Sequence, residues 1–236
     1  MKQAYLFTAL AVVFWTTGPV GSKAALMAEG GGARLTPLQV AFWAIALGWA
    51  ALAALTVARG RWRRLRDVSW RGWLVLIGMG LFGWVGYPVG INLAYTMLPL
   101  PEALIISYLN PIFVVLLQGG LFGSAARLIS GWEQEPEVER RFPVARLAIG
   151  LLLCLLGVAW IATGGRLSAV GPAPSLPGAL AALFASFAWG VYSNLGRFVA
   201  ARPGREASGL GDIHNLGAMF VGLLAMGIGL AWSDRL

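Results

Sequence analysis

Long stretches without a charged residue follow one another along the chain. Seven of them contain no Asp, Glu, Lys or Arg: Gln3–Ser22, Leu35–Ala58, Gly72–Pro101, Ala103–Ala126, Leu147–Gly165, Leu167–Gly196 and Ile213–Ser233. Each reaches the length of roughly 18–20 residues that a helix needs to cross about 30 Å of hydrocarbon. Because a segment in lipid must satisfy its own backbone hydrogen bonds, we expect an all-α integral membrane protein with seven transmembrane helices.

The first stretch follows Met1 and Lys2 and raises the alternative of a cleaved signal peptide. Its apolar part is longer than the core of a signal peptide, and Trp15, Gly18 and Pro19 interrupt it. We therefore predict a retained helix that extends to about Ala28.

The composition agrees with lipid as the solvent. Charged residues make up 12% of the chain and hydrophobic residues 58%, and the mean hydropathy is +0.72. Soluble proteins carry about 25% charged residues. The formal charge of +8 lies in the connections between apolar stretches, without a basic helix or stacking surface, so we expect no nucleic-acid partner.

The chain has one cysteine, Cys154, and one histidine, His214. One cysteine cannot form an intrachain disulfide, and these two residues are too few for an ordinary Cys or His metal site. We expect no metal and no cofactor.

Basic residues predict the orientation, because they concentrate on the cytoplasmic side of membrane proteins. One side would carry Lys2, Arg59, Arg61, Arg63, Arg64, Arg66, Arg71, Arg127, Arg140, Arg141, Arg146, Arg197, Arg202 and Arg205. The other side would carry Arg34, Arg166 and Arg235. This bias predicts a multi-pass protein of the cell inner (cytoplasmic) membrane with a cytoplasmic N-terminus. The charged segment 132–141 is then a cytoplasmic connection, either a solvated linker or a docking patch.

The first and sixth stretches resemble each other. Aligning Trp15 with Trp189 also places Lys23 on Arg197. Five spans separate the two copies, so the second enters from the opposite face, as in the inverted repeats of many transporters. We expect a five-helix first repeat over residues 1–166 and an incomplete second repeat of two helices over 167–236. A genuine seven-helix protein is the alternative.

Aromatic and polar side chains fall near the middle of several stretches. Counting about 1.5 Å per residue places Trp15, Tyr87, Tyr108, Asn110, Trp189 and Tyr192 at this depth. Such side chains usually face a cavity or another helix, so we interpret them as the lining of a substrate cavity. Pro19, Pro88 and Pro111 predict helix breaks beside them. Nearby glycines, such as Gly86 and Gly90, fit either flexibility or helix packing.

Two charges lie near one end of the stretches, Lys23 on the first helix and Glu102 at the start of the fourth. Lys23 could reach the headgroups, and Glu102 after Pro101 suits a helix N-terminus. The alternative is that the two form a charge pair at the outer side of the transport path.

Several short patterns carry a family resemblance. Trp15 precedes a basic residue by eight positions, and Glu102 precedes Tyr108-Leu109-Asn110-Pro111. The fifth stretch contains Leu156-Gly157-Val158-Ala159-Trp160, and the sixth contains Phe187-Ala188-Trp189-Gly190-Val191-Tyr192. This ordered set resembles the EamA-type transporters of the drug/metabolite transporter superfamily, and most closely their aromatic amino-acid exporters.

The resemblance implies two inverted five-helix repeats and export of small metabolites without an ATP-binding domain. It also implies that the six midplane residues line the cavity. Asn110 departs from the aromatic exporters, which typically have Trp at that position.

We therefore expect a secondary transporter, not an enzyme, that exports amino acids or related small amphipathic metabolites by alternating access. Its partners would be a small-molecule substrate and the lipid bilayer. The alternatives are a truncated membrane protein that does not transport and an intramembrane enzyme.

Overall fold

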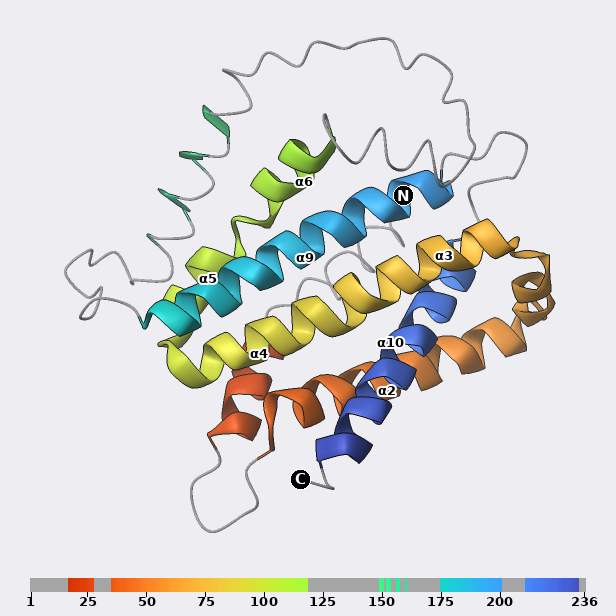
Figure 1. The fold of residues 1–236 in the computed structure, drawn as a ribbon, viewed down its shortest axis with the longest axis horizontal. Helices are drawn as coiled ribbons and strands as arrows, with labels where there is room; N and C mark the ends of the chain where they lie inside the picture. Colours follow the sequence, from red (N-terminus) through yellow and green to blue (C-terminus); the bar gives the residue numbers. More distant parts are fainter. Residues whose placement is uncertain are drawn as a thin grey trace, which may run out of the picture.

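The computed structural model describes residues 17–27, 35–118, 175–200 and 211–233, and a few positions between 149 and 160. Every regular element in these ranges is helical (Figure 1). The elements are α2 (Pro37–Ala58), η1 (Trp62–Asp67), α3 (Trp70–Met79), η2 (Gly80–Gly86), α4 (Tyr87–Met97), α5 (Leu100–Ser107), α6 (Asn110–Gln118), α9 (Leu176–Ala200) and α10 (Gly211–Ser233). Residues 17–26 form a further short helix, called here the first-helix segment.

Helix α2 begins and ends at clear local signals. The Thr36 hydroxyl accepts a hydrogen bond from the Gln39 backbone, and the Gln39 side chain accepts one from the Thr36 backbone. This reciprocal pair satisfies two N–H groups that the first turn leaves without helical partners. After α2 the chain turns at Gly60, whose φ of +65° is a conformation that glycine adopts without steric cost.

Residues Trp70–Met97 form one long rod with a change of helix type in its middle. α3 and α4 are α-helical, whereas η2 between them is a π-helix. Pro88 follows η2 at the second position of α4 and cannot donate a backbone hydrogen bond to the preceding turn. The predicted break at Pro88 therefore takes the form of a wider turn within a continuous rod.

The fourth apolar stretch does not form one uninterrupted helix. α5 ends at Ser107, the chain turns through Tyr108 and Leu109, and α6 begins at Asn110. Pro111 explains the break, because it withholds the N–H that would bond the carbonyl of Ser107. The predicted kink at Pro111 thus separates two short helices.

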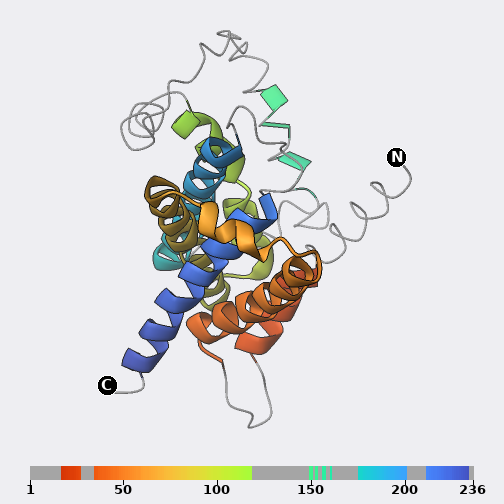
Figure 2. The same ribbon diagram turned by 90° about the vertical axis from the view of Figure 1, so that its right-hand side faces the viewer.

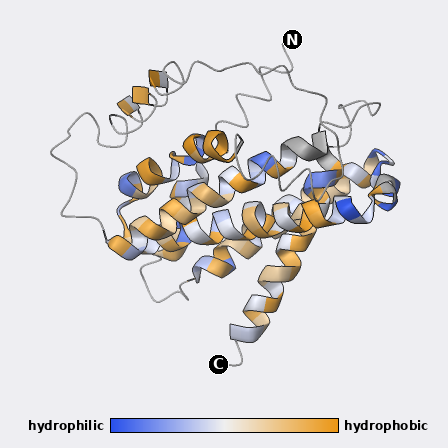
Figure 3. Cartoon of the chain, turned by 45° about the horizontal axis from the view of Figure 1, so that its top comes forward, coloured by the Kyte–Doolittle hydropathy of each residue, from blue (hydrophilic) through white to orange (hydrophobic). Residues whose placement is uncertain are grey.

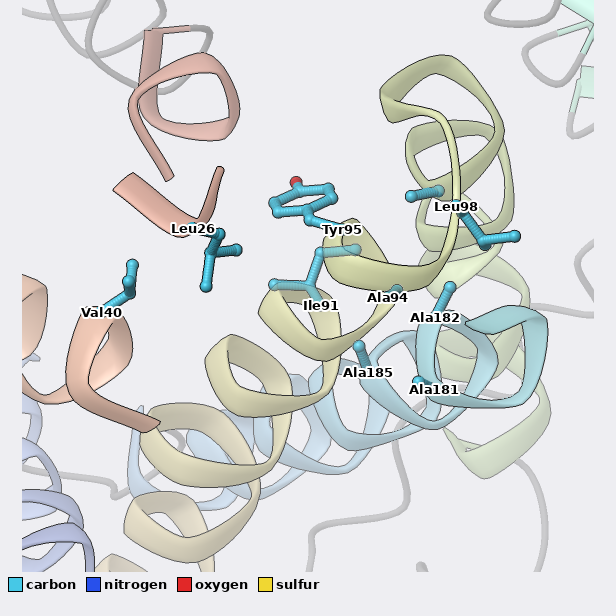
Figure 4. Close-up of a cluster of buried hydrophobic side chains, with 10 residues drawn as sticks. Leu26, Val40, Ile91, Ala94, Tyr95, Leu98, Ala181, Ala182 and Ala185 are labelled. Carbon is cyan, nitrogen blue, oxygen red and sulfur yellow. The ribbon is translucent and has the colours of Figure 1, made fainter. Parts of the chain in front are cut away.

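Helix α9 lies along the long rod and across α5 and α6 (Figures 1 and 2). Close approach depends on small residues, since Gly86 and Gly90 of the rod meet Ala188 and Ala185 of α9. A core cluster at one end joins Ile91, Ala94, Tyr95 and Leu98 of the rod to alanines of α9 and to Leu26 of the first-helix segment (Figure 4). Helix α10 packs against α2 and η2.

Among the described residues, five helical spans are long and apolar enough to cross a membrane: Pro37–Ala58, Trp70–Met97, the α5–α6 pair over Leu100–Leu117, Leu176–Gly196 and Ile213–Ser233. Hydrophobic colouring runs along their length in Figure 3, and large apolar side chains such as Trp43, Leu47 and Ile228 are exposed. The molecule is therefore built as a multi-pass membrane protein. Most of the predicted first and fifth helices lies outside the described residues, so the count of seven stays a prediction.

The connection between α2 and α3 has the character of a membrane–water boundary. The Arg66 guanidinium lies 5.5 Å from the ring centre of Trp62, and that of Arg71 lies 5.6 Å from the ring centre of Trp70. Both tryptophans are exposed. Tryptophan and arginine together are typical of the headgroup region, where an apolar ring and a cation each find their preferred surroundings.

Candidate functional site

Aromatic rings from the long rod and α9 meet in a ring cluster, defined here as Trp84, Tyr87, Trp189 and Tyr192. The ring centres of Tyr87 and Trp189 are 4.9 Å apart, and those of Trp189 and Tyr192 are 5.2 Å apart. Trp84 meets Tyr192 edge to face at 5.9 Å. Tyr87, Trp189 and Tyr192, three of the six predicted cavity residues, therefore lie in contact.

Helical spacing explains why α9 presents two rings together. Trp189 and Tyr192 are three residues apart, so they lie on the same face of the helix. That face meets η2 and the start of α4, where Trp84 and Tyr87 are also three residues apart. Tyr87, Trp189 and Tyr192 are each only half-buried, so part of each ring remains open to contact from outside the protein interior.

The position of Tyr192 depends on a residue without a side chain. A Cβ atom built on Gly83 would lie 2.3 Å from Cδ2 of Tyr192, far inside van der Waals contact. Gly83 belongs to the π-helical η2, and π-helical turns occur frequently at functional sites. The Tyr192 ring therefore rests directly on the backbone of η2.

Polar partners surround the ring cluster. The Tyr192 hydroxyl donates a 2.8 Å hydrogen bond to Oδ1 of Asn215 on α10, which links the cluster to a third element. The indole nitrogen of Trp84 is buried and has no hydrogen-bond partner among the described residues. The same is true of Oδ1 of Asn92, a little further along the rod. Buried polar atoms are nearly always hydrogen-bonded, so such atoms call for an explanation.

Tyr108 and Asn110 occupy the junction between α5 and α6, and both are half-buried. The junction is attached to α9 by two side chains. The Ser186 hydroxyl lies 2.9 Å from the Ile106 carbonyl oxygen and 3.0 Å from the Ser107 carbonyl oxygen. Asn194 donates a 3.0 Å hydrogen bond to the carbonyl of Val114. α9 thus carries the rings and also fixes the segment that bears Tyr108 and Asn110.

Lys23 and Glu102 lie at the corner where α4 meets α5. The Lys23 ammonium donates to the backbone carbonyls of Tyr95 and Leu98, the latter at 2.9 Å. Glu102 lies in the first turn of α5, as predicted for a helix N-terminus. Within the ranges that the structure describes, no ion pair joins Lys23 to Glu102, so the proposed charge pair is not formed here.

The sixth predicted cavity residue, Trp15, lies outside the described residues, as does the charged segment 132–141. Pro19 lies within the first-helix segment. Sequence reasoning missed Ser186, Asn194 and Asn215. Each is a polar residue within an apolar stretch, which is the signal that could have identified them.

The sequence of this chain also matches a known family. The model of the EamA-like transporter family matches residues 2–131, more than half of the chain. The chain belongs to the EamA-like transporter family. Searches among curated proteins and among solved structures found no match.

Membership of the EamA-like family makes this a membrane transporter of small molecules, and lipid is its surroundings. Members of this family are transporters and not enzymes. The match covers α2, the long rod, α5 and α6, so it includes Tyr87 and the junction with Tyr108 and Asn110.

Proposed function

We propose that this EamA-like protein is a secondary transporter that exports amino acids, aromatic ones among them, or related small amphipathic metabolites across the cytoplasmic membrane. The ring cluster is the observation that carries this proposal. Three of its rings are half-buried and in mutual contact, at the level of the rod where η2 passes into α4.

The chemistry of the cluster suits a substrate with a flat or apolar part and a charged head. Aromatic rings pack face to edge or offset against one another and equally against a ring or alkyl chain of a substrate. Their faces also attract a cation such as an ammonium group. The buried indole N–H of Trp84, without a partner among the described residues, is a donor beside these rings that suits a carboxylate or carbonyl.

Alternating access requires helices that bend or rock, and two helices that contact α9 have irregular backbone. The π-helical η2 contributes Trp84, and the break between α5 and α6 carries Tyr108. Such breaks are typical of transporter helices around a substrate site. We propose that the first-helix Trp15 completes the site, as its place in the family resemblance implies.

Efflux of labelled amino acids from cells that produce the protein tests this function. Trp189→Ala and Tyr87→Ala each remove one ring face from the proposed site. Loss of one such contact corresponds to roughly tenfold weaker binding, so we expect about tenfold slower efflux at low substrate concentration.

Trp43→Ala is the matched control, because Trp43 is 58% exposed on α2. Its efflux should equal that of the wild type when both proteins reach the membrane in the same amount. Efflux that is unchanged in Trp189→Ala and Tyr87→Ala, or reduced to the same degree in all three variants, would rule out the ring cluster as the substrate site.

A further inference from the structure

The corner between α4 and α5 contains two carbonyl groups that lie outside the helical backbone hydrogen-bond pattern. In a continuing helix the Tyr95 carbonyl would accept from the N–H of the residue four positions later, which here is Pro99. Leu98 is extended, with φ −125° and ψ 152°, as expected for a residue before proline. Its carbonyl therefore leaves the helical hydrogen-bond pattern as well, and the residue three positions later is Pro101.

Lys23 supplies the donor that both carbonyls lack. Its ammonium donates to both carbonyls, across a sequence separation of 72 and 75 residues. Tyr95 and Leu98 are each only 3% exposed, and Lys23 is half-buried against them. The contact also places a positive charge at the C-terminus of α4, where the helix dipole favours it.

An apolar contact one helical turn away supports the same attachment. Leu26 lies three residues after Lys23, on the same side of the first-helix segment, and is 4% exposed within the cluster of Figure 4. The segment therefore meets the α4–α5 corner at two points, one polar and one apolar.

The break at Pro111 shows the same arrangement a second time. Pro111 withholds the donor for the Ser107 carbonyl, and Ser186 of α9 lies within hydrogen-bond distance of that oxygen. In both places a proline frees a carbonyl, and a polar side chain from a distant helix lies within hydrogen-bond distance of it.

We propose that Lys23 is a positioning residue, whose ammonium fixes the first-helix segment to the α4–α5 corner by binding the carbonyls that Pro99 and the extended Leu98 leave outside the helical hydrogen-bond pattern. The Lys23 ammonium is thus held by carbonyl groups of the protein and not by lipid headgroups. Its importance for transport rests on the proposed function, because the segment continues toward Trp15. The attachment itself does not depend on what is transported.

A thiol reporter beside the contact measures this attachment. Cys154 is the only cysteine, so Cys154→Ser with Ala25→Cys leaves one thiol, at a half-buried site against the core cluster. Its reaction rate with N-ethylmaleimide in lipid nanodiscs reports release of the segment. Hydrogen bonds from a charged donor are strong enough that Lys23→Met should raise this rate at least about tenfold.

Val20→Met is the matched control, because it introduces the same side chain at a position of this segment that is 61% exposed. It should react within about twofold of the parent. A rate in Lys23→Met within about twofold of the parent, or an equal rise in both variants, would overturn the proposal. Neither result depends on transport, so the proposed function is judged separately by efflux.

A second measurement keeps the test decisive if Lys23→Met does not fold. Lys2 and Lys23 are the only lysines, so Lys2→Arg leaves Lys23 as the only side-chain amine. Its acetylation, followed by mass spectrometry, should be at least about tenfold slower in nanodiscs than in denaturing detergent. A lysine that merely reached the headgroups would react at nearly the denatured rate, and that result would also overturn the proposal.

Discussion

The ring of Tyr192 rests on the backbone of Gly83, and this close approach leads to a prediction about a single methyl group. Gly83→Ala would place a Cβ atom 2.3 Å from the Tyr192 ring, so the ring or η2 must shift. Overpacking of this kind costs about 1–3 kcal/mol. We expect the melting temperature in detergent to fall by several degrees.

Gly21→Ala provides the comparison for this variant, because Gly21 is also helical but nothing lies within 4 Å of its added Cβ. Alanine is the better helix former by about 1 kcal/mol, so the melting temperature should stay the same or rise. Equal melting temperatures for the two alanine variants would contradict the close approach of Tyr192 to η2.

Residue identity and depth were enough to select Tyr87, Trp189 and Tyr192, which lie together in the structure. Depth counting works because a helix rises by a constant amount per residue. It could not identify the partners of Lys23, since these are backbone carbonyls and every residue has one. Charges alone offered headgroup contact for Lys23, or a pair with Glu102 as the alternative, whereas the ammonium binds the carbonyls of Tyr95 and Leu98.

At the scale of helices, the junction of α5 and α6 with α9 allows a double-mutant test. Ser186→Ala removes the hydroxyl beside the Ser107 carbonyl that Pro111 leaves free. The expected loss of stability is about 1 kcal/mol, the usual value of such a hydrogen bond. Pro111→Ala restores a backbone N–H that can bond the Ser107 carbonyl. In that background Ser186→Ala should therefore lower the stability clearly less than it does in the wild type.

Ser107→Ala is the control in this cycle, because the Ser107 hydroxyl donates within its own helix, to Leu104. Unfolding of the four proteins and the control can be followed by circular dichroism in increasing denaturing detergent. Additive effects of Ser186→Ala and Pro111→Ala would show that the serine does not compensate for the proline.

The apolar stretches predicted the described helices well, because length and lack of charge are strong signals in lipid. α2, α9 and α10 each fall largely within a predicted stretch. The stretches could not show how each proline acts, since Pro88 leaves the rod continuous whereas Pro111 separates two helices. The difference arises from the neighbours: the π-helical η2 precedes Pro88, whereas at Pro111 the Ser186 hydroxyl lies within donating distance of the Ser107 carbonyl.

Contacts between the described helices show which of their ends lie on the same side of the protein. The start of α9 meets the end of α4, because Gly178 lies against Leu98. The end of α10 meets the start of α2, where Gly229 lies against Leu38. The start of α10 instead meets η1, the arginine-rich connection. α2, the long rod and the α5–α6 pair therefore alternate in direction, as do α9 and α10, whereas α9 runs in the same direction as α5–α6.

Because the two ends can be told apart, cysteine labelling can test the orientation that the basic residues predict. With Cys154→Ser as background, we expect an impermeant maleimide added to intact cells to label Met97→Cys, Ser175→Cys and Ser233→Cys, which are exposed positions at the end opposite η1. Arg63→Cys in η1 should be labelled only after the membrane is opened, because the concentration of basic residues predicts that this end is cytoplasmic. Labelling of Arg63→Cys alone would reverse the predicted orientation. Labelling of a mixed set, with Met97→Cys and Ser233→Cys on different sides, would contradict the alternating helices themselves.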